Sequence, residues 1–188
     1  MLKQGVNYDE IEKYVSQEDV AKIRGELITC PSINNTLSGT ICELSNNHAK
    51  SVFIPTTDMA VDEHGLIHEA FIFSAANYVA QAAINKEYSI LISSRSSFYA
   101  PLKFGEVLLF EAQALFDETS KKREVRVIGH VNEIKIFESS MNIVVTDEHI
   151  FKLKRPPSKN VKPEEKEKST ENSDEAMAMA LLNQVGGI

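Results

Sequence analysis

The stretch HEAFIFSAANYVAQAAI, from His68 to Ile84, is apolar on nearly every side but carries an amide, Asn77, in its middle. An amide can donate and accept hydrogen bonds, which suits holding a carbonyl group or a water molecule in place. It has no usable basicity near neutral pH, so Asn77 cannot itself activate water. The same residue also fits a purely structural role, in which it satisfies a backbone group inside the core.

The first two residues of this stretch, His68 and Glu69, can both transfer protons. The Glu69 carboxylate could act as a general base, and its expected place in the first turn also fits stabilisation of the helix dipole. His64 lies four residues before His68, and such a pair can hold zinc when both side chains share a helical face. No third ligand follows at a suitable spacing, so we expect no metal site.

Hydrophobic periodicity predicts the helices and strands that hold these residues in place. The apolar stretch predicts a core helix over about residues 66–84. Strands are expected at residues 36–44, 51–55, 88–99, 107–116, 125–131 and 134–145, with a turn at 46–47 and a bulge near 137–139. Ile90, Ile92 and Phe98 alternate as if on one face of their strand. Such half-buried patterns predict an antiparallel sheet with one solvated or partner-facing side.

The two ends of the chain differ from this middle part. Apolar residues at helical spacing over 8–28 predict one or two amphipathic helices, with Ser16 starting the second. From about Pro156 the chain is too polar to bury a core, and we expect a flexible charged tail that closes on EAMAMALLNQVGGI. This short helical ending fits either a docking peptide for a protein partner or a frayed tail without one. The predicted division is 1–30, 31–150 and 151–188.

Composition limits the classes of function. The 188 residues carry a formal charge of −7, which disfavours binding to nucleic acid, and the segment before residue 30 is too short and insufficiently basic for a DNA-binding domain. The N-terminus is too polar for a signal peptide, and the apolar stretch is short for a bilayer. We expect a cytoplasmic protein without a membrane span, in which Cys30 and Cys42 are free thiols.

Two strands, a long buried helix and four further strands form an order that resembles the hotdog fold, in which a curved sheet wraps a central helix. Hotdog thioesterases open this helix with a His-Gly-Gly-like step and carry a catalytic acid about nine residues after the His; here 68–70 read His-Glu-Ala, and Asn77 takes the place of the acid. SFYAPLKFGE, residues 97–106, resembles the aromatic strand, basic residue and Gly of the family. The resemblance covers about residues 36–146.

Within that family the chain is most similar to the ligand-sensing domain of FapR-type repressors of fatty-acid synthesis, which bind malonyl-CoA and hydrolyse nothing. Those domains also have Ala-Asn where the enzymes have an acid, here Ala76-Asn77. The resemblance implies an α+β single hotdog domain at 31–150 that forms a homodimer. It also implies that the domain binds an acyl-CoA or related thioester and uses no other cofactor. An acyl-CoA thioesterase using Glu69 or a neighbouring acid is the alternative, and an interaction protein without a pocket is a third.

The ligand-binding residues implied by the resemblance fall into three chemical groups. His68, Glu69 and Asn77 would meet the thioester, Phe71 and Phe98 would line an apolar channel or simply belong to the core, and Arg95 and Lys103 would meet the phosphates of coenzyme A. Lys121, Lys122 and Arg123 are further candidate cations, and Phe73 and Tyr78 further candidate channel residues. A dehydratase ranks low, because the adjacent His68 and Glu69 would point in different directions on a helix.

Overall fold

The fold is a mixed α+β arrangement built on one sheet and one long helix. The computed structural model describes residues 8–115 and 120–153. The chain divides into two compact units, Met1–Val145 and Thr146–Ile188. In the second unit, the described residues form a short 3-10 helix, η2 (Ile150–Lys152). All other described elements belong to the first unit.

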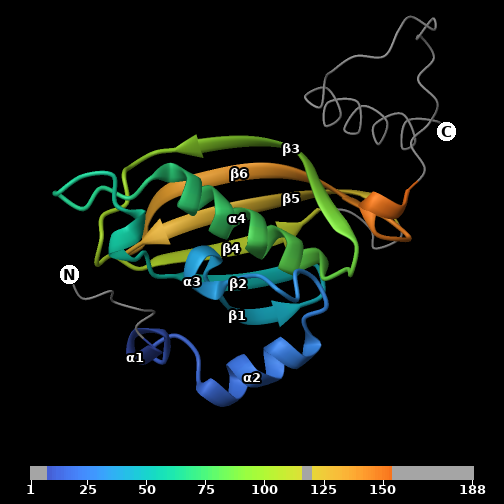
Figure 1. The fold of residues 1–188 in the computed structure, drawn as a ribbon, viewed down its shortest axis with the longest axis horizontal. Helices are drawn as coiled ribbons and strands as arrows, with labels where there is room; N and C mark the ends of the chain where they lie inside the picture. Colours follow the sequence, from blue (N-terminus) through green and yellow to red (C-terminus); the bar gives the residue numbers. More distant parts are fainter. Residues whose placement is uncertain (1–7, 116–119, 154–188) are drawn as a thin grey trace, which may run out of the picture. The chain divides into compact units, whose positions relative to one another are not determined.

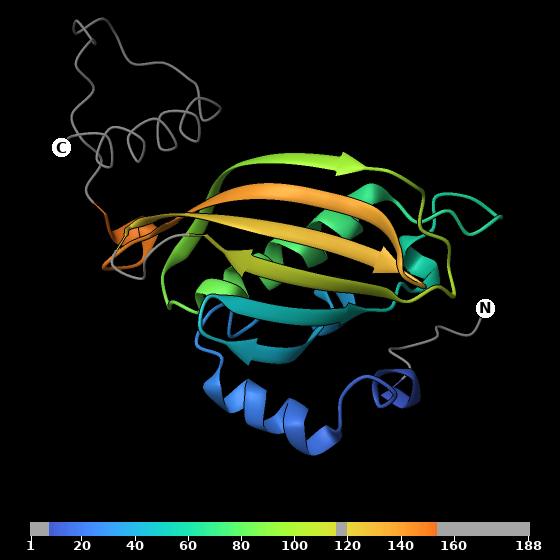
Figure 2. The ribbon, with the colours of Figure 1, turned by 180° about the vertical axis from the view of Figure 1, so that it is seen from behind.

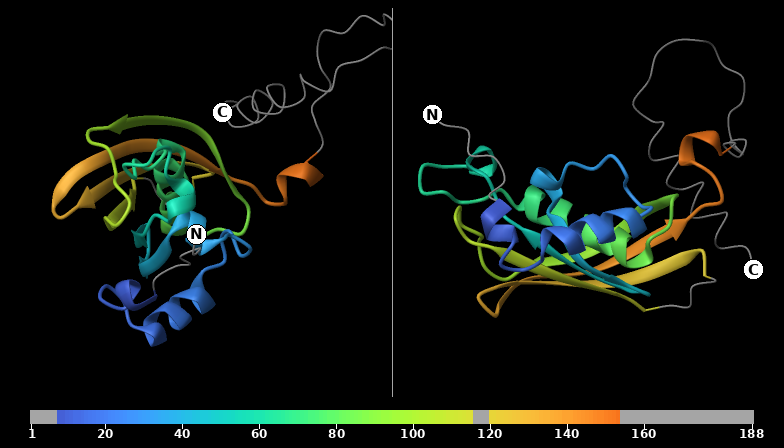
Figure 3. Two further views of the ribbon diagram at one scale, coloured as in Figure 1. Left: turned by 60° about the vertical axis from the view of Figure 1, so that its left-hand side comes forward. Right: turned by 90° about the horizontal axis from the view of Figure 1, so that it is seen from below.

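The sheet of the first unit has six strands, all paired antiparallel in the order β1-β2-β4-β5-β6-β3. The strands are β1 (Thr40–Ser45), β2 (His48–Phe53), β3 (Ser89–Phe98), β4 (Leu108–Ala114), β5 (Lys122–Val131) and β6 (Ile134–Val145). The sheet curves around the central helix α4 (Glu69–Ile84), as Figures 1 and 3 show. This is the hotdog arrangement that the resemblance implied.

Helix α4 fills the concave side of the sheet. Nine of its residues are buried, among them the alanines at 75, 76, 80, 82 and 83, whose small side chains allow the strands to approach closely. The helix begins at Glu69 rather than near residue 66, because His68 caps it: the His68 Nδ1 accepts a hydrogen bond of 3.0 Å from the Ala70 N–H. Leu66 and Ile67 instead form bridges to Lys103 and Ala60.

The outer face of the sheet is polar, as the alternating pattern predicted. In β4 the buried residues Leu108, Phe110, Ala112 and Ala114 alternate with exposed ones. Ion pairs lie on the outer face; Glu138 contacts the Arg126 guanidinium at 2.6 Å and the Lys135 ammonium at 2.8 Å. Figure 2 shows this face of the sheet from behind, with no described helix covering it.

Two strand predictions were wrong for local reasons. Residues 36–38 were expected to start the first strand, but they lie in a short helix, α3 (Asn35–Ser38), because the Asn34 side chain accepts from the Thr36 N–H at 2.9 Å. Gly39, with φ +83°, then ends the helix. Ile90 and Phe98 lie on opposite faces of β3, because the register of the β3–β6 pair shifts between Leu91 and Ser93.

Other predictions were close. The shift in the β5–β6 register places one extra residue, Ile136, opposite the Gly129–His130 step, next to the predicted bulge at 137–139. The turn at 46–47 is present, and β2 begins at His48, earlier than expected, and ends at Phe53. Ser16 caps the second helix of the extension, accepting from the Asp19 N–H at 3.1 Å.

The N-terminal extension consists of α1 (Tyr8–Ile11) and α2 (Gln17–Glu26). Helix α2 packs alongside β1, one of the two edge strands of the sheet (Figure 1). The predicted tail from residue 156, with its terminal docking segment, lies outside the described residues. Within the described part of the chain, no helix is long and apolar enough to cross a membrane.

The packing of Gly129 gives a test of the fold. A Cβ on Gly129 would lie 2.8 Å from Cε1 of Phe110, a ring that is only 2% exposed. We expect Gly129→Ala to lower the free energy of unfolding by about 1–3 kcal/mol through overpacking. Gly25→Ala is the matched control, because a Cβ there meets nothing within 4 Å in a helix and should stabilise the protein by about 0.5–1 kcal/mol. Urea unfolding measures both; equal effects of the two variants would contradict this packing.

Candidate functional site

The entrance of α4 carries the two predicted proton-transferring residues. His68 is the N-cap and Glu69 the first helical residue, and both side chains are exposed. The His68 ring contacts Phe71 edge-on with centroids 6.4 Å apart. Because the first backbone N–H groups of a helix point outward without intrahelical partners, this end can polarise a carbonyl oxygen. His68 and Glu69 could therefore meet a thioester at this end of the helix, and their role in binding it stays a prediction.

Asn77 lies two turns further along α4, on the half-buried side of the helix. Its Oδ1 accepts a 3.4 Å hydrogen bond from Nε2 of Gln81. The Gln81 Oε1 in turn accepts from the Ser89 hydroxyl at 3.1 Å and from the Cys30 thiol at 3.4 Å. The Asn77 amide is thus part of a network of neutral groups, and its Nδ2 has no hydrogen-bond partner among the described residues.

This network continues to the end of the helix and into the N-terminal segment. Asn85 ends α4 in the left-handed region with φ +47°. Its Oδ1 accepts from the backbone N–H of Ile28 at 2.8 Å and of Thr29 at 3.4 Å, and its Nδ2 donates to the Glu26 carbonyl at 3.0 Å. The next residue after Thr29, Cys30, is itself left-handed with φ +48°. The linker after α2 is therefore held in an unusual conformation by side chains of α4.

The thiol of Cys30 is a weak nucleophile in this setting. Burial raises its pKa above the ordinary value, and the hydrogen bond with the Thr29 side chain offsets only part of this. For Cys42, on β1, burial raises the pKa to about 11. Because the pKa of both thiols is raised, both cysteines stay protonated near neutral pH. They are therefore unreactive, since the thiolate is the reactive form.

The remaining predicted site residues lie away from the helix entrance. Phe98 ends β3 on the concave face, is 43% exposed and packs edge-on against Phe137 with centroids 5.1 Å apart. Arg95 lies on the opposite, outer face of β3, three residues earlier. Lys103 is in the loop before β4, where its backbone N–H donates to the Glu106 carboxylate at 2.8 Å. Within one chain, the side chains of Phe98, Arg95 and Lys103 make no hydrogen bond, ion pair or ring contact with His68, Glu69 or Asn77 among the described residues.

One further candidate cation is excluded by its burial. Arg123 was considered as a phosphate ligand, but it is 2% exposed, and its Nε donates to the Ser120 carbonyl at 3.1 Å. It pairs with Ile143 on the concave side of β5, so its guanidinium does not lie at a surface. Lys121 and Lys122 are exposed residues at the start of β5.

The residues considered for a metal site do not assemble into one. His64 lies in the loop before α4, not on the helix that follows His68, so the two histidines do not share a helical face. The Asp62 carboxylate accepts from the backbone N–H groups of His64 and Leu66, at 3.0 Å each, and shapes this loop. Within the described ranges, no group of three or more His, Cys, Asp or Glu side chains could hold a metal ion.

Sequence reasoning found Asn77 but missed its partners. Gln81 and Asn85 follow Asn77 at intervals of four residues, and Ser74 precedes it by three, so all four lie along one side of α4. The Ser74 hydroxyl lies 3.2 Å from that of Ser38 in α3. This polar side, Ser74, Asn77, Gln81 and Asn85, was visible in the spacing. The contacts of this side with residues 28–30 and 89 could not be predicted from the spacing, because those residues belong to distant segments of the chain.

The structural comparisons agree with the fold. No family model matches the chain. The crystal structure of Cj0977, a sigma28-regulated virulence protein from Campylobacter jejuni, is 61% identical with a TM-score of 0.74 and covers 75% of this chain and 99% of that one. The structure of smu.793 from Streptococcus mutans bound to acetyl CoA has a TM-score of 0.55 at 14% identity and covers 63% of this chain and 96% of that one, a likeness of fold alone.

A curated relative matches part of the chain. Methylthioribose-1-phosphate isomerase from Aquifex aeolicus is 33% identical over 106 residues, which make up 56% of this chain. The chain matches only 23% of the length of that enzyme.

The Asn85 contacts give a test of how the extension is attached. Asn85→Ala removes the side-chain hydrogen bonds to residues 26, 28 and 29 and also strains a backbone with φ +47°. We expect a loss of about 2–4 kcal/mol of stability and faster proteolysis within α2. Asn85→Gly keeps the backbone conformation, so it should recover part of the stability while leaving the proteolysis of α2 fast. Unchanged cleavage of α2 in both variants would contradict this attachment.

Proposed function

Because this chain belongs to the same family as the Campylobacter jejuni protein, within the thioesterase-like hotdog superfamily, we propose that it binds an acyl-CoA or a related thioester without hydrolysing it. A protein of this fold holds acetyl CoA in its crystal structure, so the fold can accommodate a coenzyme A thioester. The finer resemblance to the ligand-sensing domains of FapR-type repressors is part of the same proposal.

The observation that carries the proposal is the chemistry around Asn77. Its hydrogen-bonded neighbours, Gln81 and, through it, Ser89 and Cys30, are all neutral groups. None has a carboxylate or imidazole that could remove a proton from water, and the Cys30 thiol is held protonated by burial, which raises its pKa. The free Nδ2 of Asn77 can donate to a thioester carbonyl. The network thus favours holding the ligand and provides no base for its hydrolysis.

Glu69 is the candidate base of the alternative function, acyl-CoA thioesterase. Its carboxylate is exposed and has no hydrogen-bond partner among the described residues. Eight residues separate it from Asn77, which places the two roughly 12 Å apart along the helix axis. Within one chain, a water molecule held by Asn77 is therefore out of reach of Glu69. This geometry favours binding over hydrolysis.

A second chain would bring the separated groups together. β3 is an edge strand ten residues long, of which five are exposed and none is buried. Such an edge invites pairing with another strand, and the half-buried polar side of α4 also needs a cover. In a dimer formed through β3, Phe98 of one chain, on the concave face, can approach the α4 of the other, whereas Arg95 lies on the outer face beside the same edge. Phe71 and Phe98 would then line the acyl channel, with Arg95 and Lys103 available for the phosphates.

A regulatory role fits the way in which the site is connected. Asn77 reaches the linker after α2 through Gln81 and Cys30, while Asn85 of the same helix holds Ile28 and Thr29. A thioester that takes up the Asn77 amide would change the partners of Gln81. We propose that occupancy alters how the N-terminal extension, or the tail that lies beyond the described residues, engages another protein.

The binding proposal is tested by following thermal stability and free thiol in the same samples across a panel of acyl-CoAs. We expect stabilisation without thiol release, because a ligand present at about 100 times its Kd adds about 2.7 kcal/mol to the native state. Asn77→Ala should weaken binding about tenfold through the lost hydrogen bonds at the ligand carbonyl. Asn77→Asp adds the missing base and should release thiol, which makes it the positive control.

Two outcomes would contradict non-catalytic binding. Thiol release by the wild-type chain that scales with protein concentration and disappears in Glu69→Gln would make it a thioesterase. An absence of stabilisation by every acyl-CoA would favour an interaction protein without a ligand pocket.

Dimerisation through β3 predicts both a mass and an exchange pattern. Two chains of 21.0 kDa give a mass of about 42 kDa, to be measured by light scattering. The backbone N–H groups of β3 that face away from β6 should exchange slowly with solvent in the dimer and faster on dilution, because a partner strand protects them. A mass of one chain at all concentrations, with fast exchange along β3, would exclude this interface.

A further inference from the structure

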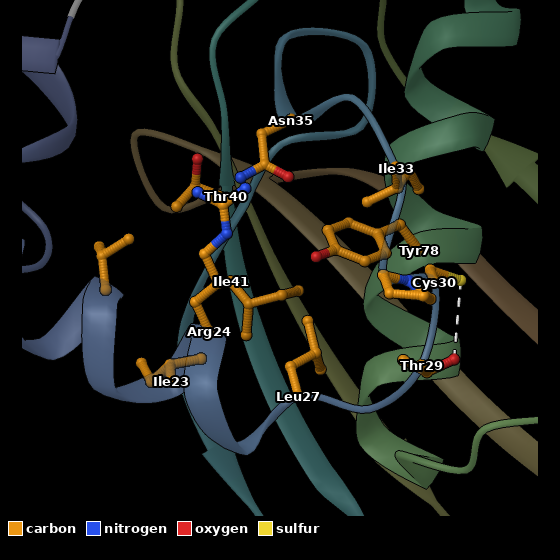
Figure 4. Close-up of a pocket in the computed structure, with 12 residues that line it drawn as sticks. Ile23, Arg24, Leu27, Thr29, Cys30, Ile33, Asn35, Thr40, Ile41 and Tyr78 are labelled. Atoms are coloured by element: carbon orange, nitrogen blue, oxygen red, sulfur yellow. Dashed lines mark hydrogen bonds between the residues drawn. The ribbon is translucent and has the colours of Figure 1, made fainter.

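A cavity lies between the N-terminal extension and the hotdog domain. It has a volume of about 160 Å³, is open to solvent on one side and is lined by α2, the linker that follows it, β1 and the side chain of Tyr78 from α4 (Figure 4). A cavity of about 150 Å³ is large enough to hold a benzene molecule. This one adjoins a wider cavity of about 550 Å³ between α1, α2 and α3, because Val20, Arg24, Ile33, Asn35 and Thr40 line both.

The hydroxyl group of Tyr78 points into this cavity. The residue is only 4% exposed, and its hydroxyl has no hydrogen-bond partner among the residues that the structure describes. The ring of Tyr78 is buried but its hydroxyl oxygen is open to the cavity, so it is available to donate to an acceptor bound there. Burial raises the pKa of Tyr78 to about 12, which keeps the hydroxyl protonated and therefore able to donate at neutral pH.

Arg24, an exposed residue of α2, adds a positive charge at the mouth of the same cavity. Its side chain extends from α2 toward Thr40 and Asn35 across the cavity in Figure 4. No carboxylate within the described ranges pairs with its guanidinium. The one acid lining the wider cavity, Glu12, already accepts a hydrogen bond from Gln17. The side chains of Thr40 and Asn35 also make no hydrogen bond to a described residue, so several donors face the cavity without an acceptor.

The other walls are apolar. Ile23, Leu27, Ile33 and Ile41 line the smaller cavity, and Ile11, Val15 and Val20 line the wider one. A ligand that matches these walls has an aliphatic body and a compact anionic head with several acceptor oxygens. A carboxylate meets this requirement, because its two oxygens can accept from a guanidinium and a phenol together.

We propose that the cavity between α2, β1 and α4 is a binding site for an aliphatic carboxylate, with Arg24 and Tyr78 holding the carboxylate and the apolar side chains of α2 and β1 holding the chain. Tyr78 follows Asn77 in sequence but lies about 100° around the helix, so the two side chains face different sides of α4, although Cys30, which contacts Gln81 of the Asn77 network, also lines this cavity. Carboxylate binding here does not depend on the proposed thioester binding.

The test is calorimetric titration of the full chain with decanoate. We expect saturable binding of one decanoate per chain, about tenfold or more weaker in Arg24→Gln and roughly three- to tenfold weaker in Tyr78→Phe, since each change removes a donor to the carboxylate. Lys22→Gln is the matched control, because it removes one positive charge from the same helix at an exposed position that lines neither cavity. Decanol, which has the chain without the charge, should bind far more weakly than decanoate.

Melting temperatures of the variants separate a lost contact from a lost fold, and Tyr78→Phe keeps the buried ring in place. An absence of saturable binding to the wild-type chain would overturn the proposal. So would equal affinities in Arg24→Gln and Lys22→Gln, or displacement of decanoate by an acyl-CoA that binds at the other site.

Discussion

The whole fold depends on the burial of one helix in a curved sheet. Helix α4 presents alanines and larger apolar residues to the sheet on three sides, and the concave faces of the strands supply the complementary surface, including the edge-on ring pair of Phe110 and Phe137, 5.7 Å apart. A helix this apolar cannot remain in water, so the strands must wrap it. Its fourth side carries the polar residues Ser74, Asn77, Gln81 and Asn85.

The polar side of α4 connects the parts of the molecule that differ in role. Its C-terminal end holds the linker after α2 through Asn85, and its middle offers the Asn77 amide. The two edge strands of the sheet, β1 and β3, also differ in what lies beside them. Helix α2 packs alongside β1, whereas the edge of β3 has no partner among the described strands. One edge thus faces the extension, with a cavity between them, and the other is available to a second chain.

Much of this arrangement could be predicted from the sequence, because the hydrophobic pattern of strands and of α4 is strong and its order is characteristic. In β4 and β5, buried residues alternate with more exposed ones, in agreement with the half-buried strand patterns of the sequence. The failures were local: a single side-chain cap at Asn34 converts 36–38 into a helix, and one extra residue at Ile92 reverses the face of Ile90. The Asn77 network and the Tyr78 cavity depend on segments about 40–60 residues apart, such as Cys30 with Gln81 and Ile41 with Tyr78, which no local pattern encodes.

We propose that the chain holds a thioester without cleaving it. Carbon-13 NMR of acyl-CoAs labelled at the thioester carbonyl, mixed with an equal amount of protein, tests this claim directly. We expect a carbonyl signal that shifts on binding, through the hydrogen bond from the Asn77 amide, and then persists unchanged for hours. Conversion of that signal to a free carboxylate at a rate that scales with protein would contradict it.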